Sequence, residues 1–402
     1  MEFLLHGHEI NLKGGNRGFF SSKLHAAVEV LLAGLPVRVR MAGLGLRVSC
    51  ADADASEVRR RLGFALGVQT ITAGFRLPME MEPIAAEALR TIAGQSGESF
   101  GLQVKRPDKD AALSSYELAS FCGRYIQERL PLHVDLKRPD RVCALVIQRD
   151  GVLVSRAPEA GPGGMPAATA GRLLALISSG YDSPLAAYRL MRRGAKVAML
   201  HFYAAPLPGR ASSQQIVEQL ARHLTRYQLH TAAYFCHFEP LQRQIVAAVP
   251  SPFRVLIYRR MMLRIAEAVA RRHKAHGLIT GDSLAQVASQ TVRNLEAVSR
   301  VATLPIYRPL IGDDKVTIQN QTREIGTYDL SSENPADCCS AFLPPHPALA
   351  SSPEELDAAE TRLDIPALVA QALAAIDLRR YHWSRGRVVE GIDHAAAGRS
   401  GG

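Results

Sequence analysis

The residues whose types and spacing point most clearly to chemistry are Ser178–Ser183, with the sequence SSGYDS. An apolar run that ends at Ile177 precedes them, and Pro184 follows them. Proline suits the first position of a helix, because its missing N–H would have no partner there in any case. The pattern predicts a buried strand, a short turn and a helix. Backbone N–H groups and the positive end of the helix dipole then converge on one point, and such a point binds phosphate.

Asp182 is the residue of this turn with the most chemistry. A carboxylate beside bound phosphates is unfavourable unless a cation lies between them, so we expect Asp182 to hold Mg²⁺. The alternative is a plain strand-to-helix turn that Ser183 or Asp182 caps. The segment contains neither GxxxxGK[ST] nor GxGxxG, so it differs from the two common nucleotide-binding fingerprints.

The elements that must position this turn alternate between short apolar runs and segments of helical period. We expect strands at 173–177, 197–203, 232–235 and 278–280. Short apolar strands separated by helices predict a doubly wound parallel sheet. Residues 344–359 are expected to form a surface loop, and the tail from His394 is expected to be disordered.

The first part of the chain follows a different pattern. Residues 1–75 predict the order β-α-β-β-α-β of a ferredoxin-like unit. Residues 76–165 predict a second small α/β unit, which closes with a hairpin at Asp150 and Gly151. Residues 159–171 are rich in glycine and proline and predict a linker. The fold class is therefore α/β and α+β, with three domains at 1–75, 76–165 and 166–385 and a flexible tail at 386–402.

Composition restricts the class of protein. The chain has 402 residues, 47% of them hydrophobic, and a formal charge of +10, which favours a polyanionic partner. Its mean hydropathy is −0.02 and no apolar run is long enough to span a bilayer, so no membrane contact is expected. The opening MEFLLHGHEI is too short in apolar residues to be a signal peptide, and six cysteines are too few for a secreted scaffold. We therefore expect a cytoplasmic protein.

SSGYDS resembles the PP-loop, SGGxDS, of ATP pyrophosphatases that cleave ATP between its α and β phosphates. Ser179 stands where that class has glycine, and it would be strained if the backbone needed a positive φ there. Further segments resemble one family within this class, the tRNA 4-thiouridine synthases, which are also linked to the thiazole of thiamine. They occur in order over nearly the whole chain: EINLKGGNRGFF, VKRPDK, GPGG, RRMMLRIAE, TGDSLAQVASQT, RPLIGDDK, EIGTYD and DCC.

This resemblance implies a ferredoxin-like domain, an RNA-binding THUMP domain and a PP-loop domain, with tRNA, ATP and Mg²⁺ as ligands. The implied RNA contacts are basic residues of the first two domains: Lys13, Arg17, Lys105, Arg106 and Lys109. The implied ATP contacts lie around the turn and the strand ends: Leu176, Ile177, Ser178, Ser179, Gly180, Tyr181, Ser183, His201, Phe202, Arg259, Gly281 and Gln290. By itself, His201 would be interpreted as a packed strand-end histidine.

The resemblance also implies catalytic roles. Asp182 holds the metal, Lys315 stabilises charge on the phosphates, and Cys338 carries a persulfide. The thiol that resolves Cys338 is Cys339 or Cys236. No rhodanese domain follows, so a cysteine desulfurase or other persulfide donor must serve. The family suggests a homodimer; an iron–sulfur cluster is a minor alternative, because three well-spaced cysteines are not evident.

Two other functions stay open from the sequence. One is a different PP-loop enzyme that modifies RNA, for example by amidation. The other is a tRNA-binding protein whose PP-loop has decayed, as Ser179 would suggest.

Overall fold

The computed structural model describes residues 1–43, 45–106, 113–204, 212–332 and 347–391. The chain divides into two compact units, Met1–Met165 and Pro166–Gly402. Lys109, Cys338 and Cys339 lie outside the described residues. No helix in the described ranges is long and apolar enough to cross a membrane.

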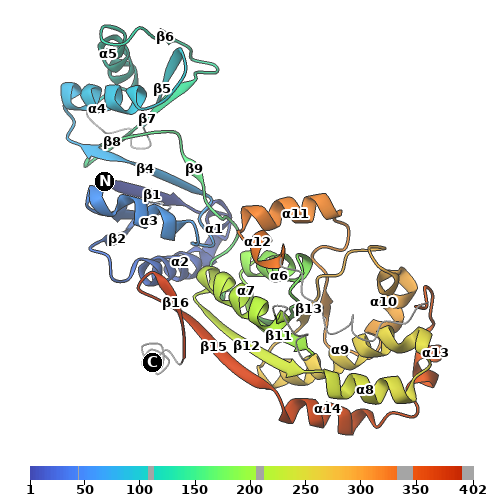
Figure 1. Ribbon diagram of the computed structural model, residues 1–402. Coiled ribbons are helices and arrows are strands. Elements are labelled where there is room, and N and C mark those ends of the chain that lie inside the picture. The colour runs from blue at the N-terminus through green and yellow to red at the C-terminus, as the bar shows by residue number, and fades with distance from the viewer. Residues whose placement is uncertain (44, 107–112, 205–211, 333–346, 392–402) are drawn as a thin grey trace. The chain divides into compact units, whose positions relative to one another are not determined.

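The first unit contains nine strands and five α-helices within its described residues (Figure 1). In chain order they are β1 (Glu2–His6), α1 (His8–Asn11), α2 (Arg17–Leu32), β2 (Arg38–Ala42), β3 (Gly45–Ser49), α3 (Ala55–Leu62), β4 (Thr70–Leu77), α4 (Met81–Ala93), β5 (Ser99–Lys105), α5 (Ser115–Gln127), β6 (His133–Val134), β7 (Arg141–Gln148), β8 (Gly151–Ser155) and β9 (Glu159–Ala160).

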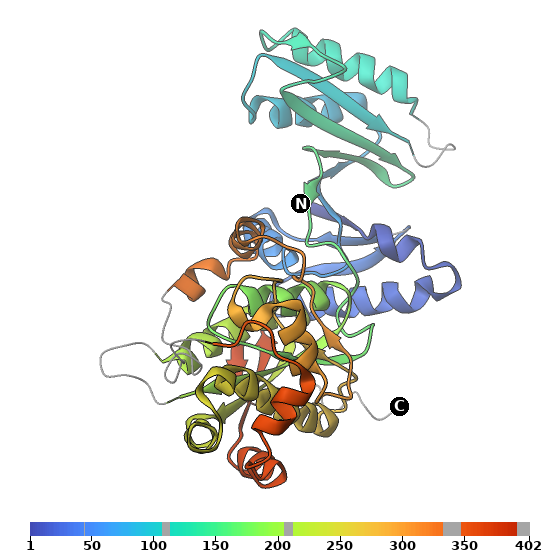
Figure 2. The same cartoon turned by 90° about the vertical axis from the view of Figure 1, so that its right-hand side faces the viewer.

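The sheet of this unit runs in the order β2-β3-β1-β4-β8-β7-β5-β6, and β9 pairs with β4. Its first four strands are antiparallel and have the predicted ferredoxin-like arrangement. Helices α4 and α5 pack on the strands of the second half (Figure 2). Strand β4 pairs with β1 along its first part and with β8 along its last part. The predicted boundary at residue 75 therefore falls inside a strand that both halves share.

The second unit alternates strands and helices as the sequence predicts. In chain order its elements are β10 (Arg172–Leu176), α6 (Asp182–Arg192), β11 (Lys196–Tyr203), α7 (Ser213–Gln228), β12 (His230–His237), α8 (Glu239–Ala248), α9 (Arg254–Arg272), β13 (Leu278–Ile279), α10 (Val292–Ser299), β14 (Ile306–Tyr307), α11 (Lys315–Glu324), α12 (Tyr328–Ser332), α13 (Pro353–Ala359), α14 (Ile365–Ala374), β15 (Asp377–Ser384) and β16 (Arg387–Glu390).

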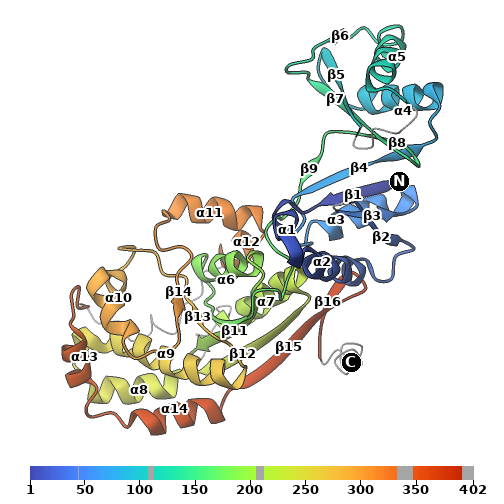
Figure 3. The same cartoon turned by 180° about the vertical axis from the view of Figure 1, so that it is seen from behind.

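The sheet of the second unit runs in the order β14-β13-β10-β11-β12-β15-β16, and its first five strands are parallel. The chain leaves β10 toward β11 on one side and later returns to β13 on the other. This reversal is a topological switch point, and open α/β sheets bind ligands at the carboxyl ends of the strands beside it. Strands β15 and β16 form an antiparallel hairpin on the far edge, beside β12 (Figure 3).

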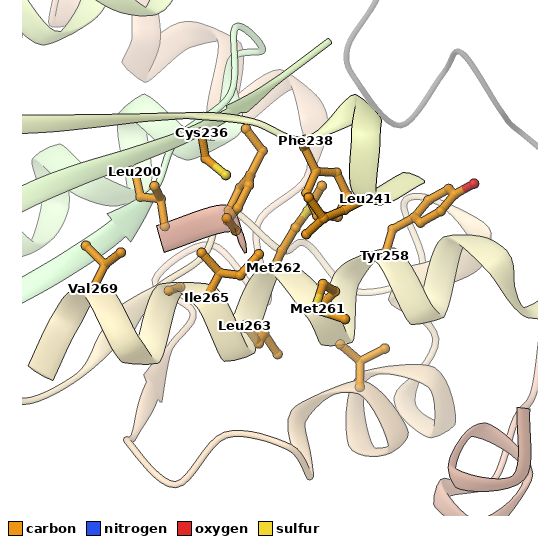
Figure 4. Close-up of a cluster of buried hydrophobic side chains, with 14 of the residues drawn as sticks. Leu200, Cys236, Phe238, Leu241, Tyr258, Met261, Met262, Leu263, Ile265 and Val269 are labelled. Atoms are coloured by element: carbon orange, nitrogen blue, oxygen red, sulfur yellow. The ribbon is translucent and has the colours of Figure 1, made fainter. Parts of the chain in front are cut away.

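Helices cover both faces of this sheet, with α6 and α7 on one face and α9 and α14 on the other. Helix α9 supplies much of the core, where Tyr258, Met261 and Ile265 lie close to Leu200 and Phe238 (Figure 4). All five of these side chains are fully buried. Burial of one such side chain contributes about 1.5–3 kcal/mol, so this cluster fixes the strands whose ends carry the site.

The structure corrects four local predictions. The expected surface loop at 344–359 contains α13, which Ser352 caps through a capping box. The predicted tail contains β16, because its backbone pairs with β15. Part of the predicted linker forms β9, which pairs with β4. Helix α6 begins at Asp182, two residues before Pro184.

Candidate active site at the carboxyl ends of β10 and β13

The turn after β10 is closed by hydrogen bonds between its own two ends. Ser178 N donates to Ser183 Oγ at 2.7 Å, and the two hydroxyl oxygens lie 3.0 Å apart. Gly180 N also donates to Ser178 Oγ at 3.3 Å. Helix α6 starts within this turn, at Asp182, and its N-cap residue Tyr181 makes no side-chain cap, so no side chain at the N-cap competes with an anion for the first amides of the helix. The turn has the strand–loop–helix geometry of a phosphate site.

Ser179 fits this turn without backbone strain. It is buried, and it is not among the described residues other than glycine that have a positive φ. Gly180 does not have a positive φ either. The departure of Ser179 from the PP-loop pattern therefore gives no conformational reason for the loop to have lost its function.

Gly281 brings the segment after β13 directly against this turn. A Cβ atom at Gly281 would lie 2.6 Å from Ser183 N and 2.9 Å from Asp182 C. Such distances are far below van der Waals contact, so only glycine allows the two backbones to approach this closely. The sequence predicted Gly281 as an ATP contact, and the structure gives it a packing role at the same place.

Asp182 lies in the first turn of α6, where its Oδ2 accepts a hydrogen bond from Gln286 Nε2 at 3.2 Å. Burial raises the pKa of Asp182, while Gln286 and the positive charge of Lys315 act in the opposite direction. Two residues with predicted catalytic roles are therefore electrostatic neighbours. Gln286 was not singled out from the sequence, although it lies in the segment TGDSLAQVASQT.

Lys315 is the first residue of α11, and Asp314 caps this helix by accepting from Thr317 N. Arg189 of α6 holds the preceding segment, since it donates to Pro309 O at 2.7 Å and pairs with Asp313 at 2.5 Å. Ser283 Oγ also donates to Asp313 O at 2.9 Å. The helix that starts at the phosphate turn thereby fixes the position of Lys315.

Asp282 organises the part of the site that the sequence analysis missed. Its buried carboxylate pairs with Arg259 at 2.5 Å and with Arg308 at 3.2 Å, and it accepts from Thr280 Oγ1 at 2.7 Å. Burial alone would raise the pKa of Asp282, but Arg259, Thr280 and Arg308 together hold it below its usual value. The sequence signal that could have identified Asp282 is its position directly after Gly281, close to the end of a strand.

Some of the predicted nucleotide contacts line a small cavity, whereas Phe202 is packed in the core. Leu176 and Arg259 line a cavity of about 40 Å³ together with Thr280 and Asp282. Phe202, in contrast, is a core residue whose ring packs edge-to-face on Phe238 at 5.3 Å. Gln290 lies within 3.4 Å of Asp282, so it lies next to one of the residues that line this cavity.

His201 is packed, as its strand-end position suggested. Its two ring nitrogens lie 2.9 Å from Ile177 O and 3.1 Å from Ser213 Oγ, so it links the end of β10 to the start of α7. Burial lowers the pKa of His201 to about 4, and the bond to Ile177 opposes this only in part. His201 is therefore neutral at pH 7 and holds the strand end in place.

The pKa of His201 predicts a pH dependence of stability. In the unfolded chain a histidine titrates near 6.5, so the unfolded state takes up the proton first as the pH falls. The part of the free energy of unfolding that depends on neutral His201 is fully present above about pH 6.5 and is lost as the pH falls through about 4. This part amounts to about 3 kcal/mol. We expect the variant His201→Gln to lose less free energy of unfolding than the wild type between pH 7 and pH 4. Urea unfolding at both pH values measures this, and equal losses would contradict it.

Cys236 is unsuited to resolve a persulfide. It is fully buried beside Phe238 and Leu200 in the core (Figure 4). Burial raises the pKa of Cys236 to about 12, so the reactive thiolate is almost absent at pH 7.

Helix α12 ties the segment before Cys338 to the phosphate turn. Ser331 Oγ donates to Gly180 O at 3.3 Å, and the rings of Tyr181 and Tyr328 stack with centroids 4.9 Å apart. Cys338 is the sixth residue after Ser332, the end of α12.

Of the predicted RNA contacts that the structure describes, Lys13, Arg17 and Lys105 are exposed on the first unit. Lys105 lines a hollow of about 910 Å³ together with His8, Arg47 and Arg149. Arg17 lines a second hollow of about 510 Å³, and Gly43 belongs to both linings. Lys13 is exposed, and its ammonium group lies 5.6 Å from the ring centre of Phe20. Arg106 is partly buried and lies next to Lys105.

A doubly wound sheet with an amide-lined turn at its switch point defines a nucleotide-binding domain, and comparison with known proteins agrees. Residues 168–365 match the family described as "Thiamine biosynthesis protein (ThiI)". A probable tRNA sulfurtransferase of Thermus thermophilus is 39% identical over 94% of this chain and 93% of its own length. One of Moorella thermoacetica is 37% identical over 92% and 95%.

Solved structures give the same result. A crystal structure of a 4-thiouridine synthetase in complex with RNA and bound ATP has a TM-score of 0.85 and 28% identity, covering 94% of this chain and 99% of that one. PH1313 from Pyrococcus horikoshii has a TM-score of 0.61 at 19% identity over 81% and 99%, and it shares the fold. The chain belongs to the ThiI family of tRNA sulfurtransferases, which confirms the predicted resemblance and fold class.

Proposed function

We propose that this protein is an ATP-dependent tRNA sulfurtransferase that converts uridine at position 8 of tRNA to 4-thiouridine. The observation that carries the proposal is the strand–turn–helix unit at Ser178–Ser183, which lies at the switch point of the sheet and has Asp182 and Lys315 as electrostatic neighbours. A site of this kind holds the phosphates of ATP where charge develops during adenylation. The ATP and RNA bound to the related 4-thiouridine synthetase support the same ligands here.

In the first step, uridine O4 attacks the α-phosphorus of ATP and pyrophosphate leaves. The turn holds the phosphates through backbone N–H groups, and Lys315 stabilises the charge that passes to the leaving pyrophosphate. Leu176 and Ile177 end β10, so their backbones are placed to hold adenine at the edge of the sheet. The product is a uridine with AMP attached to O4, a good leaving group.

The residues present fit a Mg²⁺ ion. This ion is usually held by one or two carboxylates together with phosphate oxygens, and Asp182 supplies one carboxylate beside the turn. No group of three or more histidine, cysteine or acidic side chains that could hold a metal occurs among the described residues. Asp182 would thus share the ion with ATP, and bound Mg²⁺ would neutralise phosphate charge.

In the second step, the outer sulfur of a persulfide on Cys338 attacks C4 of the activated uridine and AMP leaves. The base is then joined to Cys338 through a disulfide. A second thiol attacks the Cys338 sulfur, which releases 4-thiouridine and leaves a protein disulfide that an external thiol must reduce. Cys339 remains the candidate for this thiol, because Cys236 is buried.

The proposal includes the partners that the reaction needs. Lys13, Arg17, Lys105, Arg106 and Lys109 would contact tRNA phosphates, which position RNA without reading its sequence. A cysteine desulfurase or similar protein would load the persulfide in the cytoplasm. A homodimer and a role in making the thiazole of thiamine complete the proposal, and the name of the matching family supports the latter.

The two alternatives have weaker support. A decayed PP-loop is disfavoured because Ser179 fits its position without a positive φ. Another RNA-modifying activity, such as amidation, would not need a sulfur-carrying thiol, whereas the relatives that cover nearly the whole chain are named tRNA sulfurtransferases.

Mass spectrometry of tRNA tests the proposal. After incubation with protein, ATP, Mg²⁺ and a persulfide source, we expect one uridine to gain the mass of a sulfur-for-oxygen exchange. The variant Cys338→Ala should release pyrophosphate from ATP in the presence of tRNA but give no thiolated product. Asp182→Ala should do neither. Thiolation by Cys338→Ala would refute the sulfur step, and absence of tRNA-dependent pyrophosphate release in the wild type would refute the activity itself.

A further inference from the structure

A second cavity in the catalytic unit lies at the opposite edge of the sheet from the phosphate turn. It has a volume of about 230 Å³. The residues that line it come from the amino ends of β11 and β12, from the hairpin β15–β16 and from the end of α9: Lys196, Val197, Ala198, His230, Thr231, Ala232, His273, Arg380, Tyr381, His382 and Gly391. None of them belongs to the site described above.

Strand register brings four basic residues into one row across this edge. Arg172 of β10 lies opposite Lys196 of β11, and His230 of β12 lies opposite His382 of β15. Continuing the printed register of β11 and β12 places Lys196 opposite His230. Residues opposite each other on neighbouring strands point to the same face. The row Arg172, Lys196, His230, His382 therefore joins four adjacent strands.

The next row of the same face explains why a cavity is present. Ala232 lies opposite Arg380, and the same register places Ala198 beside Ala232. The side chains of Ala198 and Ala232 are only methyl groups, so they leave space above the sheet at this place. Arg380 borders this space. His273, at the carboxyl end of α9, borders the cavity from another element and lies 3.1 Å from Tyr234 Oη through its Nδ1.

The charges around the cavity all have the same sign. Burial lowers the pKa of Lys196, and the neighbouring Arg172 lowers it further. Burial also lowers the pKa of His273, followed by the positive charges of Arg172, Lys196 and Arg380. No carboxylate occurs among the lining residues.

Two nearby negative groups do not balance this charge. Glu390 precedes Gly391, but it lies opposite Tyr381 rather than in the basic row, and it pairs with Arg222 at 2.5 Å. The carboxyl end of α9 carries only about half a negative charge. Arg172 and Lys196 lie opposite each other on neighbouring strands, and like charges in such a position repel, so this pair costs stability unless an anion offsets it.

We propose that this cavity binds a phosphate group. Arginine and lysine are the side chains that bind phosphate most often, and several of them together suit an anion of two negative charges. The phosphate group could come from the backbone of tRNA or from a free ion such as phosphate. Strand β10 separates this edge from the phosphate turn by five residues, about 16 Å of chain. The two anion sites are therefore distinct.

Thermal unfolding of the full-length protein with and without inorganic phosphate tests for the site. We expect phosphate to raise the Tm of the wild type, because a ligand that binds only the folded state stabilises it. The variant Lys196→Gln should bind phosphate about tenfold more weakly, as expected when one charged hydrogen bond is lost. It should also melt at a higher temperature than the wild type in phosphate-free buffer, since a like-charge contact is removed.

Three further variants keep this test decisive. Arg380→Gln removes an exposed charge at the cavity and should weaken phosphate binding even if Lys196→Gln folds poorly. Arg362→Gln removes an exposed charge elsewhere in the unit and should bind phosphate as the wild type does. Inorganic phosphate also fits the turn Ser178–Ser183, which has Lys315 as a neighbour. The variant Lys315→Gln weakens binding at the turn but not in the cavity, so it should retain the part of the Tm shift that comes from the cavity.

The salt dependence of tRNA binding identifies the source of the phosphate group. If it belongs to the tRNA backbone, Lys196→Gln should lower the slope of log K against log salt by about one relative to Arg362→Gln. An unchanged slope, together with loss of the phosphate-dependent Tm shift, would assign the cavity to a free anion. If both cavity variants match Arg362→Gln in the Tm shift and in the slope, the proposal is wrong.

Discussion

Replacing Lys315 with alanine is expected to lower kcat for tRNA-dependent pyrophosphate release by about 10²–10³-fold, which is typical for loss of one group that stabilises developing charge. Burial raises the pKa of Asp182 and the positive charge of Lys315 opposes this rise, so the ammonium group of Lys315 is near the turn Ser178–Ser183. Asp314 and Arg189 fix the start of α11, so this position does not depend on a bound ligand. Rates measured by a coupled pyrophosphate assay at saturating ATP and tRNA give the effect.

The control is Arg362→Ala, which removes one exposed positive charge from the same unit. It should keep the wild-type rate. Lys315→Ala should also keep its free energy of unfolding within about 0.5 kcal/mol of the wild type, as surface substitutions do. A rate within threefold of the wild type would show that another group carries the charge stabilisation.

Replacing Gly281 with alanine is expected to lower kcat/KM for ATP by about 10²-fold. The added Cβ would lie 2.6 Å from Ser183 N and 2.8 Å from Ser183 Cα, which are both atoms of the α6 backbone. Backbone cannot move aside as a flexible side chain would, so the turn must shift. A displacement of about 1 Å in a positioned group reduces rates by about this factor. Overpacking should also lower the free energy of unfolding by about 1–3 kcal/mol.

A glycine in the neighbouring segment provides the matched control. A Cβ at Gly312 would meet no atom within 4 Å, and its φ lies outside the left-handed region. Gly312→Ala should therefore leave the kinetics and the free energy of unfolding nearly unchanged. If Gly281→Ala behaves like Gly312→Ala, close contact between the two segments is not needed for ATP use.

Much of the fold follows from short-range pattern. The apolar runs before Ser178 and around Val197 became β10 and β11, and the alternation of strands and helices gave the doubly wound sheet. Short-range sequence pattern predicted least well the segments whose structure depends on pairing with another strand. Residues 387–390 were predicted to belong to a flexible tail but form β16, because β15 offers backbone partners and the turn at Arg385 and Gly386 has the positive φ values of a tight hairpin.

The candidate site could be predicted only in part for the same reason. The turn Ser178–Ser183 is contiguous in sequence, so residue types and spacing were sufficient to find it. Asp282 was missed, since its importance depends on two arginines that lie 23 positions before it and 26 positions after it. His201 and Phe202 share a strand end with the site, yet packing gives one a structural hydrogen bond and the other a place in the core.

By itself, the sequence determined the phosphate turn, the alternation of elements and the family resemblance, because each depends on residues that are neighbours along the chain. Only the tertiary structure decided that Gly281 touches the start of α6, that Asp182 and Lys315 share one electrostatic environment, and that Arg172, Lys196, His230 and His382 form one row. These contacts depend on strand order and register, which are set by the burial of a whole sheet between two layers of helices.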